Sequence, residues 1–192
     1  MHNIHNIMEI VQLNANAKLS EHLASPSEAA LGHSNKLDGS HLSPNFTLGE
    51  FTKSGSHPEV YNIPSHEAIS NLTNLCKWLE VLRERAGTPI RINSGYRSPQ
   101  LNKRIGGVPT SNHLTGCAVD IRVSGMEQLI RYAAILLDYA DESKQDFDEL
   151  LIEKNRYGAI WLHFAVRPKD RSATQGDACQ SKNRRKVAFI NA

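Results

Sequence analysis

The sequence predicts an α+β fold in which helices pack on one face of a small antiparallel sheet. Two long segments carry apolar residues at helical spacing, and four short segments resemble strands in their alternation of apolar and polar residues. The chain has 192 residues, of which 40% are hydrophobic, and this is enough for one core. We therefore expect one globular domain, at residues 42–168, between two polar arms.

The first half of this domain contains the clearest helix signal, between Ser65 and Gly87. The apolar positions that indicate this helix are Ile69, Leu72, Leu75, Cys76, Leu79 and Leu82. Residues 89–93 then alternate as a strand does, and a short helix is predicted from Ser98 to Gly106.

In the second half of the domain the sequence predicts a strand, a helix and then two strands joined by a turn. Residues 119–123 alternate as a strand, and residues 126–140 have the apolar stripe of an amphipathic helix. Residues 150–153 and 160–166 flank a turn-rich stretch, which predicts an antiparallel hairpin.

The arms differ from the domain in composition. Residues 1–41 are rich in Asn, His, Ser and Ala, which predicts a mobile or partner-dependent arm, and residues 169–192 predict a basic polar tail. The whole chain has 22 basic and 20 acidic residues, so its charge does not require nucleic acid or an anionic membrane. The tail lacks aromatic residues between its basic ones, and we expect no nucleic-acid binding.

Residues 1–19 lack the apolar stretch and cleavage site of a signal peptide, and no segment has the length of a membrane span. We therefore expect synthesis in the cytoplasm without a signal peptide. Cys76, Cys117 and Cys179 form no CxxC pair and are interpreted as ordinary thiols. Nothing in the sequence indicates the oligomeric state.

Three residues form a candidate metal site. His113 lies in a loop, and Asp120 follows seven residues later within a predicted strand. In the strand 160–166 the period of two places Trp161 and His163 on the face opposite the apolar residues. Two imidazoles and a carboxylate are ligands of catalytic zinc, which keeps a fourth position for water. Taken singly, a histidine in a strand such as His163 is more often a structural residue than a metal ligand, and Asp120 could pair with an arginine.

Several motifs in order resemble the zinc D-alanyl-D-alanine carboxypeptidases and their phage endopeptidase relatives, whose metal site the hedgehog signalling domain shares. They are Leu42 to Phe51 (LSPNFTLGEF), Ser94-Gly95-Tyr96-Arg97-Ser98, Asn102, Gly106-Gly107, Ser111-x-His113-x-x-Gly116-x-Ala118-x-Asp120 and Trp161-x-His163. The resemblance runs from about Leu42 to Val166, and its opening segment is most similar to the subgroup found in phage and prophage genomes.

The resemblance implies that His113, Asp120 and His163 bind one Zn²⁺ ion. It also implies that Arg97 stabilises the oxyanion formed when water attacks the peptide carbonyl, a role suited to a permanently charged guanidinium. The alternative for Arg97 is a salt bridge that holds its loop, and the two roles are compatible.

The general base is less clearly indicated. Some members of the family carry an acidic residue three positions before the last histidine ligand, where this chain has Ile160. Glu153, at the end of the partner strand of the hairpin, is our candidate base. The alternative is a surface glutamate next to a turn.

Tyr96, Ser111 and Trp161 are weaker candidates. The two rings are predicted to line the substrate groove, and Ser111 to donate a hydrogen bond beside the metal. Each of the three has a purely structural role as its alternative.

The leading hypothesis is a zinc metallopeptidase that cuts a peptidoglycan stem peptide, either after D-alanine or between L-alanine and D-glutamate. Such an enzyme would act on the cell wall after release from the cell, or as part of a phage particle. The alternative is a non-catalytic module that keeps the zinc fold as a structural part of a phage particle or as a cell-wall anchor. It is motivated by Ile160, which replaces the acidic residue, and by the two arms.

Overall fold

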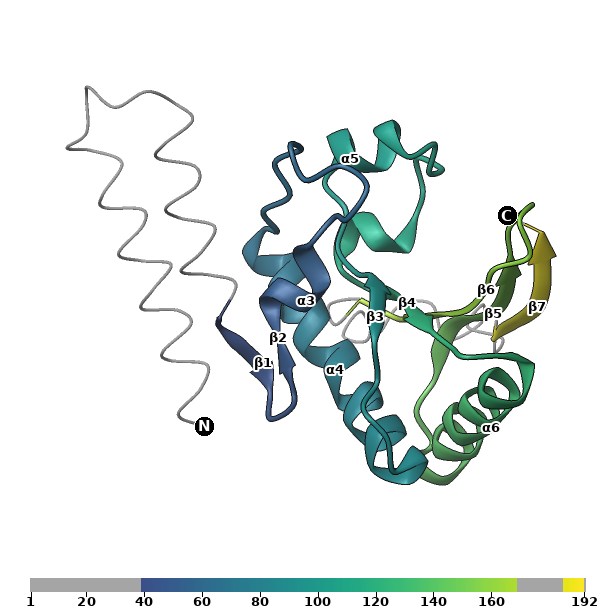
Figure 1. The fold of residues 1–192 in the computed structure, drawn as a ribbon. Coiled ribbons are helices and arrows are strands. Elements are labelled where there is room, and N and C mark those ends of the chain that lie inside the picture. The colour runs from purple at the N-terminus through teal and green to yellow at the C-terminus, as the bar shows by residue number, and fades with distance from the viewer. Residues whose placement is uncertain (1–38, 169–184, 192) are drawn as a thin grey trace, which may run out of the picture.

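The computed structural model describes residues 39–168 and 185–191 (Figure 1). Its elements in chain order are β1 (His41–Ser43), β2 (Phe46–Thr47), α3 (Leu48–Thr52), α4 (His66–Ala86), β3 (Ile92–Ser94), α5 (Pro99–Arg104), η1 (Asn112–Thr115), β4 (Ala118–Arg122), α6 (Met126–Ser143), β5 (Phe147–Lys154), β6 (Ile160–Val166) and β7 (Lys186–Asn191).

The main sheet has five strands in the order β3-β4-β6-β5-β7. The first four strands pair antiparallel, while β7 lies parallel to β5 at the edge. The predicted α+β class with a small sheet and packed helices is confirmed. Strand β7 was not predicted, because it falls in the segment that we interpreted as a polar tail. Residues 1–38 of the predicted arm at 1–41, and residues 169–184 and 192 of the predicted tail, lie outside the described residues.

The predicted helix between Ser65 and Gly87 is present as α4, and both of its ends have clear causes. The Ser65 hydroxyl accepts a hydrogen bond from the backbone N–H of Ala68, which is the usual N-cap contact. At the other end Gly87 adopts a left-handed conformation with φ of 65° and donates to the carbonyls of Arg83 and Glu84. Strand β3 starts later than predicted, at Ile92, and Pro89 lacks the N–H that a strand ladder needs.

Helices α4 and α6 cover one face of the sheet (Figure 1). The core between them contains the apolar side chains of β4 and β6 that were predicted to point this way, including Val119, Ile121, Leu162 and Phe164. Trp78 of α4 lies at its centre, where its ring contacts those of Tyr139, Phe147 and Phe164.

The strand register decides what lies on the opposite face. In β4 and β6, Val119 is paired with Phe164, and Asp120 with His163. Directly paired residues of an antiparallel ladder point to the same side, and successive residues alternate. Since Val119 and Phe164 belong to the core, Asp120 and His163 project together from the face away from α4 and α6.

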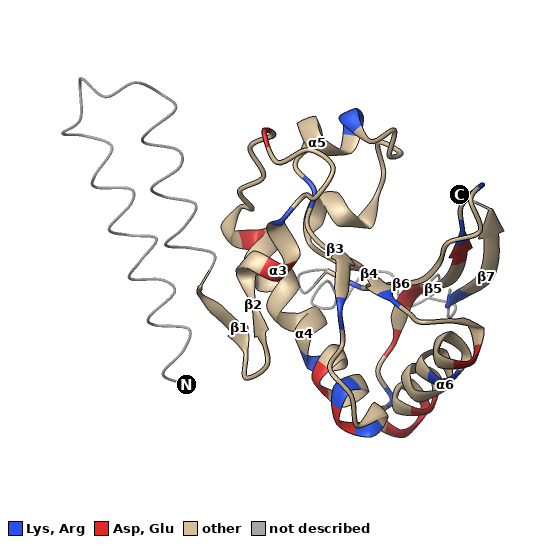
Figure 2. Cartoon of the chain, in the orientation of Figure 1, with Lys and Arg blue, Asp and Glu red and all other residues tan. Residues whose placement is uncertain are grey.

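Charged residues of both signs are interspersed along the helices and strands, in keeping with the small net charge (Figure 2). None of the helices in the described part of the chain combines the length and the apolar character needed to cross a bilayer.

Candidate metal centre

The loop that carries His113 is capped at its start and held against α4 at its end. Ser111 caps the short helix η1, where its hydroxyl accepts a 3.4 Å hydrogen bond from the backbone N–H of His113. Gly116 ends η1 with φ of 72°, and Asn71 of α4 donates to the carbonyl of Thr115 at 2.9 Å. This packing turns His113 inward, and its side chain is only 3% exposed.

The ligand atoms of His113, Asp120 and His163 lie within 4.8 Å of one another, and all three residues are buried. Oδ1 of Asp120 is 3.3 Å from Nε2 of His113 and 2.9 Å from Nδ1 of His163. Ligand atoms at about 2.0–2.1 Å from one tetrahedral zinc ion are separated by about 3.3 Å. The spacing and the chemistry of these donors therefore fit a single zinc ion.

The second nitrogen of each imidazole determines which nitrogen can bind a metal. Nδ1 of His113 donates a 2.6 Å hydrogen bond to the carbonyl of Gly95, which leaves the lone pair of Nε2 directed at Asp120. In His163 the arrangement is reversed, since Nδ1 faces Asp120 and Nε2 lies 3.4 Å from Oε2 of Glu149.

Gly95 reaches His113 because the backbone passes very close to α3. A Cβ atom at Gly95 would lie 2.7 Å from backbone atoms of Phe51, so a larger residue could not keep this position. The glycine of the Ser-Gly-Tyr-Arg motif thus places a carbonyl oxygen against the imidazole.

The charges of the site suit a cation. Burial alone would raise the pKa of Asp120, but the adjacent His113 and His163 rings outweigh this effect and hold the pKa well below its usual value. Burial lowers the pKa of His163, but the hydrogen bond to Asp120 and the nearby carboxylate of Glu149 overcome this effect and raise the pKa to about 9. Asp120 is therefore a carboxylate at neutral pH, and in the absence of metal His163 carries a proton.

Arg97 lies beside the ligands and forms the salt bridge that was the alternative to its catalytic role. Nη2 of Arg97 donates to Oδ2 of Asp120 at 2.5 Å, and Nε donates to the hydroxyl of Ser94 at 2.9 Å. Its backbone N–H also donates to the carbonyl of His113 at 3.1 Å. Arg97 thus holds the Oδ2 atom of Asp120, and Oδ1 faces the histidines. Stabilisation of an oxyanion by Arg97 stays a prediction.

The residues predicted to contact substrate have differing surroundings. Tyr96 is 8% exposed and packs in the hydrophobic core, and Ser111 caps η1 as described above. Both therefore have structural roles, and a substrate contact of either stays a prediction. Trp161 lies on the same face as His163, and its Nε1–H donates to Oε2 of Glu153 at 2.6 Å.

The candidate base Glu153 lies on the site face of β5, directly paired with Trp161. Two residues earlier along the same strand, Leu151 is paired with His163. Glu153 thus stands about 7 Å along the strand from the row of His163, at about 3.4 Å per residue. Its negative charge also contributes to the raised pKa of His163, after burial and the hydrogen bonds.

Glu149 contacts the site, although the sequence did not indicate it. Simple alternation from buried Phe147 places Glu149 on the core face, two residues on. The structure has an irregularity in the ladder between these two residues, where Phe147 pairs with Val166 and Glu149 with the next residue, Ala165. One extra residue in β5 forms a bulge, and Glu149 turns to the face of His163. Alternation alone gives no signal for such a bulge.

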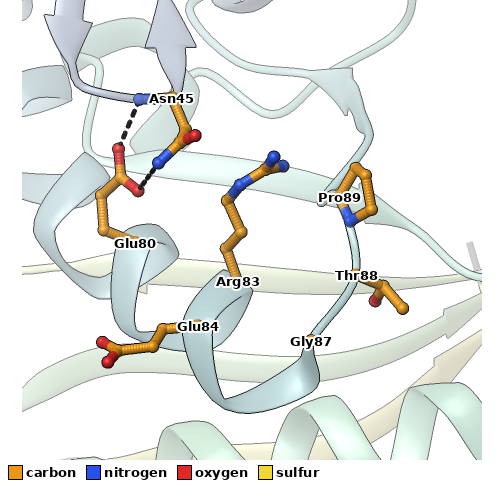
Figure 3. A pocket seen from close by; sticks show the side chains of 7 residues that line it. All are labelled: Asn45, Glu80, Arg83, Glu84, Gly87, Thr88 and Pro89. Carbon is orange, nitrogen blue, oxygen red and sulfur yellow. Dashed lines mark hydrogen bonds between the residues drawn. The ribbon is translucent and has the colours of Figure 1, made fainter.

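A pocket of about 470 Å³ lies at the C-terminal end of α4 (Figure 3). It is lined by Asn45, Glu80, Arg83, Glu84, Gly87, Thr88 and Pro89. Asn45 closes one side, with its backbone and side-chain nitrogens donating to the Glu80 carboxylate at 2.8 and 2.7 Å. At 1.5 Å per helical residue, Arg83 is about 22 Å along α4 from Ala68, which contacts the metal loop. None of the metal-site residues lines this pocket.

Two imidazoles and one buried carboxylate on the face of a small sheet place this chain in the class of proteins whose donors fit a mononuclear zinc site. Comparison with protein-family models gives a match to peptidase M15 over residues 44–144. This is more than half of the chain, and the chain belongs to the peptidase M15 family. No curated protein matches it in a sequence search.

The family makes the chain a zinc-dependent metallopeptidase that acts on peptidoglycan-like substrates. The matched segment includes His113 and Asp120 but ends before His163. The position of His163 beside them therefore comes from the pairing of β4 with β6 and is independent of the match.

Proposed function

We propose that this chain hydrolyses a peptide bond in the stem peptide of bacterial peptidoglycan, as a D-Ala-D-Ala carboxypeptidase or an L-Ala-D-Glu endopeptidase. The observation that carries the proposal is the convergence of His113, Asp120 and His163, buried and within 4.8 Å of one another, in a chain of the M15 family. The chemistry that zinc supplies when bound at such residues is polarisation of a carbonyl and activation of water.

Within this proposal Glu153 is the general base. Its Oε2 atom is occupied by the indole N–H of Trp161, and Oε1 is left to accept the proton of the attacking water. Glu149 is less suited to this role, because its carboxylate lies at Nε2 of His163, and the nitrogen that faces Asp120 is Nδ1. A base on the Nε2 side of the ring would be directed away from the metal.

Arg97 would add a positive charge next to the reacting carbonyl. Its Nη2 and Nε atoms hold Asp120 and Ser94, and the guanidinium has further N–H groups with which to bind the developing oxyanion. The similarity of residues 42–51 to the phage and prophage subgroup leads us to propose a phage or prophage origin, with action on the wall after release or from the virion.

The direct test is mass spectrometry of muropeptides after incubation of sacculi with the purified full chain, with and without a zinc chelator. We expect a new amine at one stem-peptide bond, lost with the chelator and in Glu153→Gln. Glu142→Gln, which alters an exposed carboxylate paired with Arg85, is the matched control and should retain activity. Intact muropeptides with zinc-loaded protein would refute the proposal.

A second candidate is a zinc-containing module that binds the wall without cutting it. The observation that favours it is that both candidate catalytic side chains already have partners, Arg97 with Asp120 and Glu153 with Trp161. Under this alternative these contacts only stabilise the site. Sedimentation of the protein with sacculi, without release of any muropeptide, would favour it.

A further inference from the structure

In the metal centre, the buried Nε2 atom of His163 has a carboxylate nearby but no hydrogen bond to it. Nε2 of His163 is one of two buried side-chain atoms in the described part of the chain that lack a hydrogen-bond partner. The nearest carboxylate oxygen, Oε2 of Glu149, is 3.4 Å away, within ion-pair range. If Nδ1 binds a metal, Nε2 must carry the proton, and a buried N–H needs an acceptor.

Glu149 is itself held from two sides. Nδ2 of Asn112, in η1, donates to Oε2 at 3.2 Å, and Nζ of Lys186, in β7, lies 3.1 Å from Oε1. Glu149 and Lys186 are directly paired in the parallel ladder between β5 and β7. The carboxylate of Glu149 is therefore fixed between η1 and β7.

The strand that carries Lys186 is firmly docked. Arg185, just before β7, places its guanidinium 2.6 Å from Asp141 and 3.2 Å from Asp146, and it also lies over the ring of Phe147. The ladder with β5 then continues from Lys186 to Asn191. These contacts determine where Lys186 lies, and the whole strand falls outside the segment matched to the family.

We propose that Glu149 is a positioning residue for the metal ligand His163, and that Lys186 holds Glu149 in place, so that strand β7 is part of the metal centre. The inference rests on the proposed use of His163 as a ligand through Nδ1. A carboxylate at Nε2 keeps the proton on that nitrogen, orients the ring and makes Nδ1 a stronger donor to the cation. Asn112 links the same carboxylate to the loop of His113.

The test is the zinc affinity of the full chain, measured by competition with a chromogenic chelator. Loss of such a partner typically weakens metal binding about 10–100-fold, and we expect this for Glu149→Ala. Glu149→Gln keeps an oxygen acceptor and should lose less, and Lys186→Ala should weaken binding severalfold. Glu142→Ala removes an exposed carboxylate of a distant ion pair and should bind zinc as the wild type does.

A second readout does not depend on affinity. Nitrogen-15 NMR of the imidazole rings in the zinc-loaded protein should show His163 with its proton on Nε2, and in Glu149→Ala this preference should be weakened. Circular dichroism of the metal-free variants identifies any loss of fold, and Lys186, which is exposed on β7, gives a variant that leaves the core intact.

The outcomes separate the two proposals. Wild-type affinity and an unchanged His163 tautomer in both Glu149→Ala and Lys186→Ala would overturn the positioning role but leave the proposed hydrolase untouched. A wild-type chain that binds no zinc would overturn the hydrolase and this inference together. Weaker zinc binding in the Glu149 variants with normal binding in Lys186→Ala would overturn the part assigned to β7.

Discussion

Replacement of Gly116 by alanine tests how the metal loop, which consists of η1 and Gly116 and carries His113, is held against α4. Gly116 has φ of 72°, and a Cβ atom there would lie 2.5 Å from the carbonyl oxygen of Ala68. The left-handed backbone costs an L-residue about 1–2 kcal/mol. Forcing extra volume into a packed site costs about 1–3 kcal/mol more. We therefore expect the free energy of unfolding to fall by about 2–5 kcal/mol.

The control is Gly87→Ala. Gly87 has a similar φ of 65°, but a Cβ atom there would meet nothing within 4 Å. It should lose only the backbone term of about 1–2 kcal/mol. For a chain of this size about 2–4 °C in Tm corresponds to each kcal/mol, so Gly116→Ala should melt about 4–20 °C below the wild type.

Thermal unfolding of the metal-free protein followed by circular dichroism measures both variants, and chelator competition measures their zinc affinity. Because Gly116 closes the turn that holds His113, only Gly116→Ala should also bind zinc more weakly. Equal losses of stability in the two variants, with equal zinc affinity, would refute the reasoning that the close approach to Ala68 positions the loop.

Four further predictions concern His163, Arg97 and the buried thiols. Since the pKa of His163 is raised to about 9, zinc must displace a proton from this ring below that pH. The apparent zinc affinity should therefore rise about tenfold per pH unit from 7 to 9 and then level off. The pKa of His163 is raised from its ordinary value of 6.5, so protonation of its ring stabilises the metal-free fold. This contribution to the free energy of unfolding is complete below pH 6.5 and should be lost as the pH rises through 9, as measured by equilibrium unfolding. Arg97→Lys keeps the positive charge but loses the hydrogen bond to Ser94. Zinc content, measured by elemental analysis, should be retained, while the rate of muropeptide release should fall about 100-fold. An unchanged rate would leave Arg97 only its salt bridge. Burial raises the pKa of Cys76 to about 12, and Cys117 is also buried, so in a Cys179→Ser background no thiol should react with Ellman's reagent before unfolding.

The parts of the fold that the sequence predicted are those in which local pattern and tertiary packing agree. The helix ending at Gly87 has a periodic apolar face, a serine cap and a C-terminal glycine, and each corresponds to a contact in α4. The alternation in residues 160–166 correctly placed Trp161 and His163 on one face, since the core takes the other.

Features set by distant pairing could not be predicted in this way. Strand β7 has only six residues after a polar segment, and its place depends on its register with β5. Glu149 was missed because a bulge reverses the alternation after Phe147. For Arg97, the sequence left both the salt bridge and the oxyanion role open. Its contact with Asp120 depends on the pairing of β3 with β4, which the sequence does not specify.

The direct pairing of Asp120 with His163 has a consequence for the order of events in folding. These two side chains are 43 positions apart along the chain, and they meet only once β4 and β6 have joined. A zinc ion therefore finds its complete set of donors late, after the central ladder exists. Zinc should leave the refolding rate of the chain almost unchanged and act by slowing unfolding, as expected for an interaction that forms after the rate-limiting step.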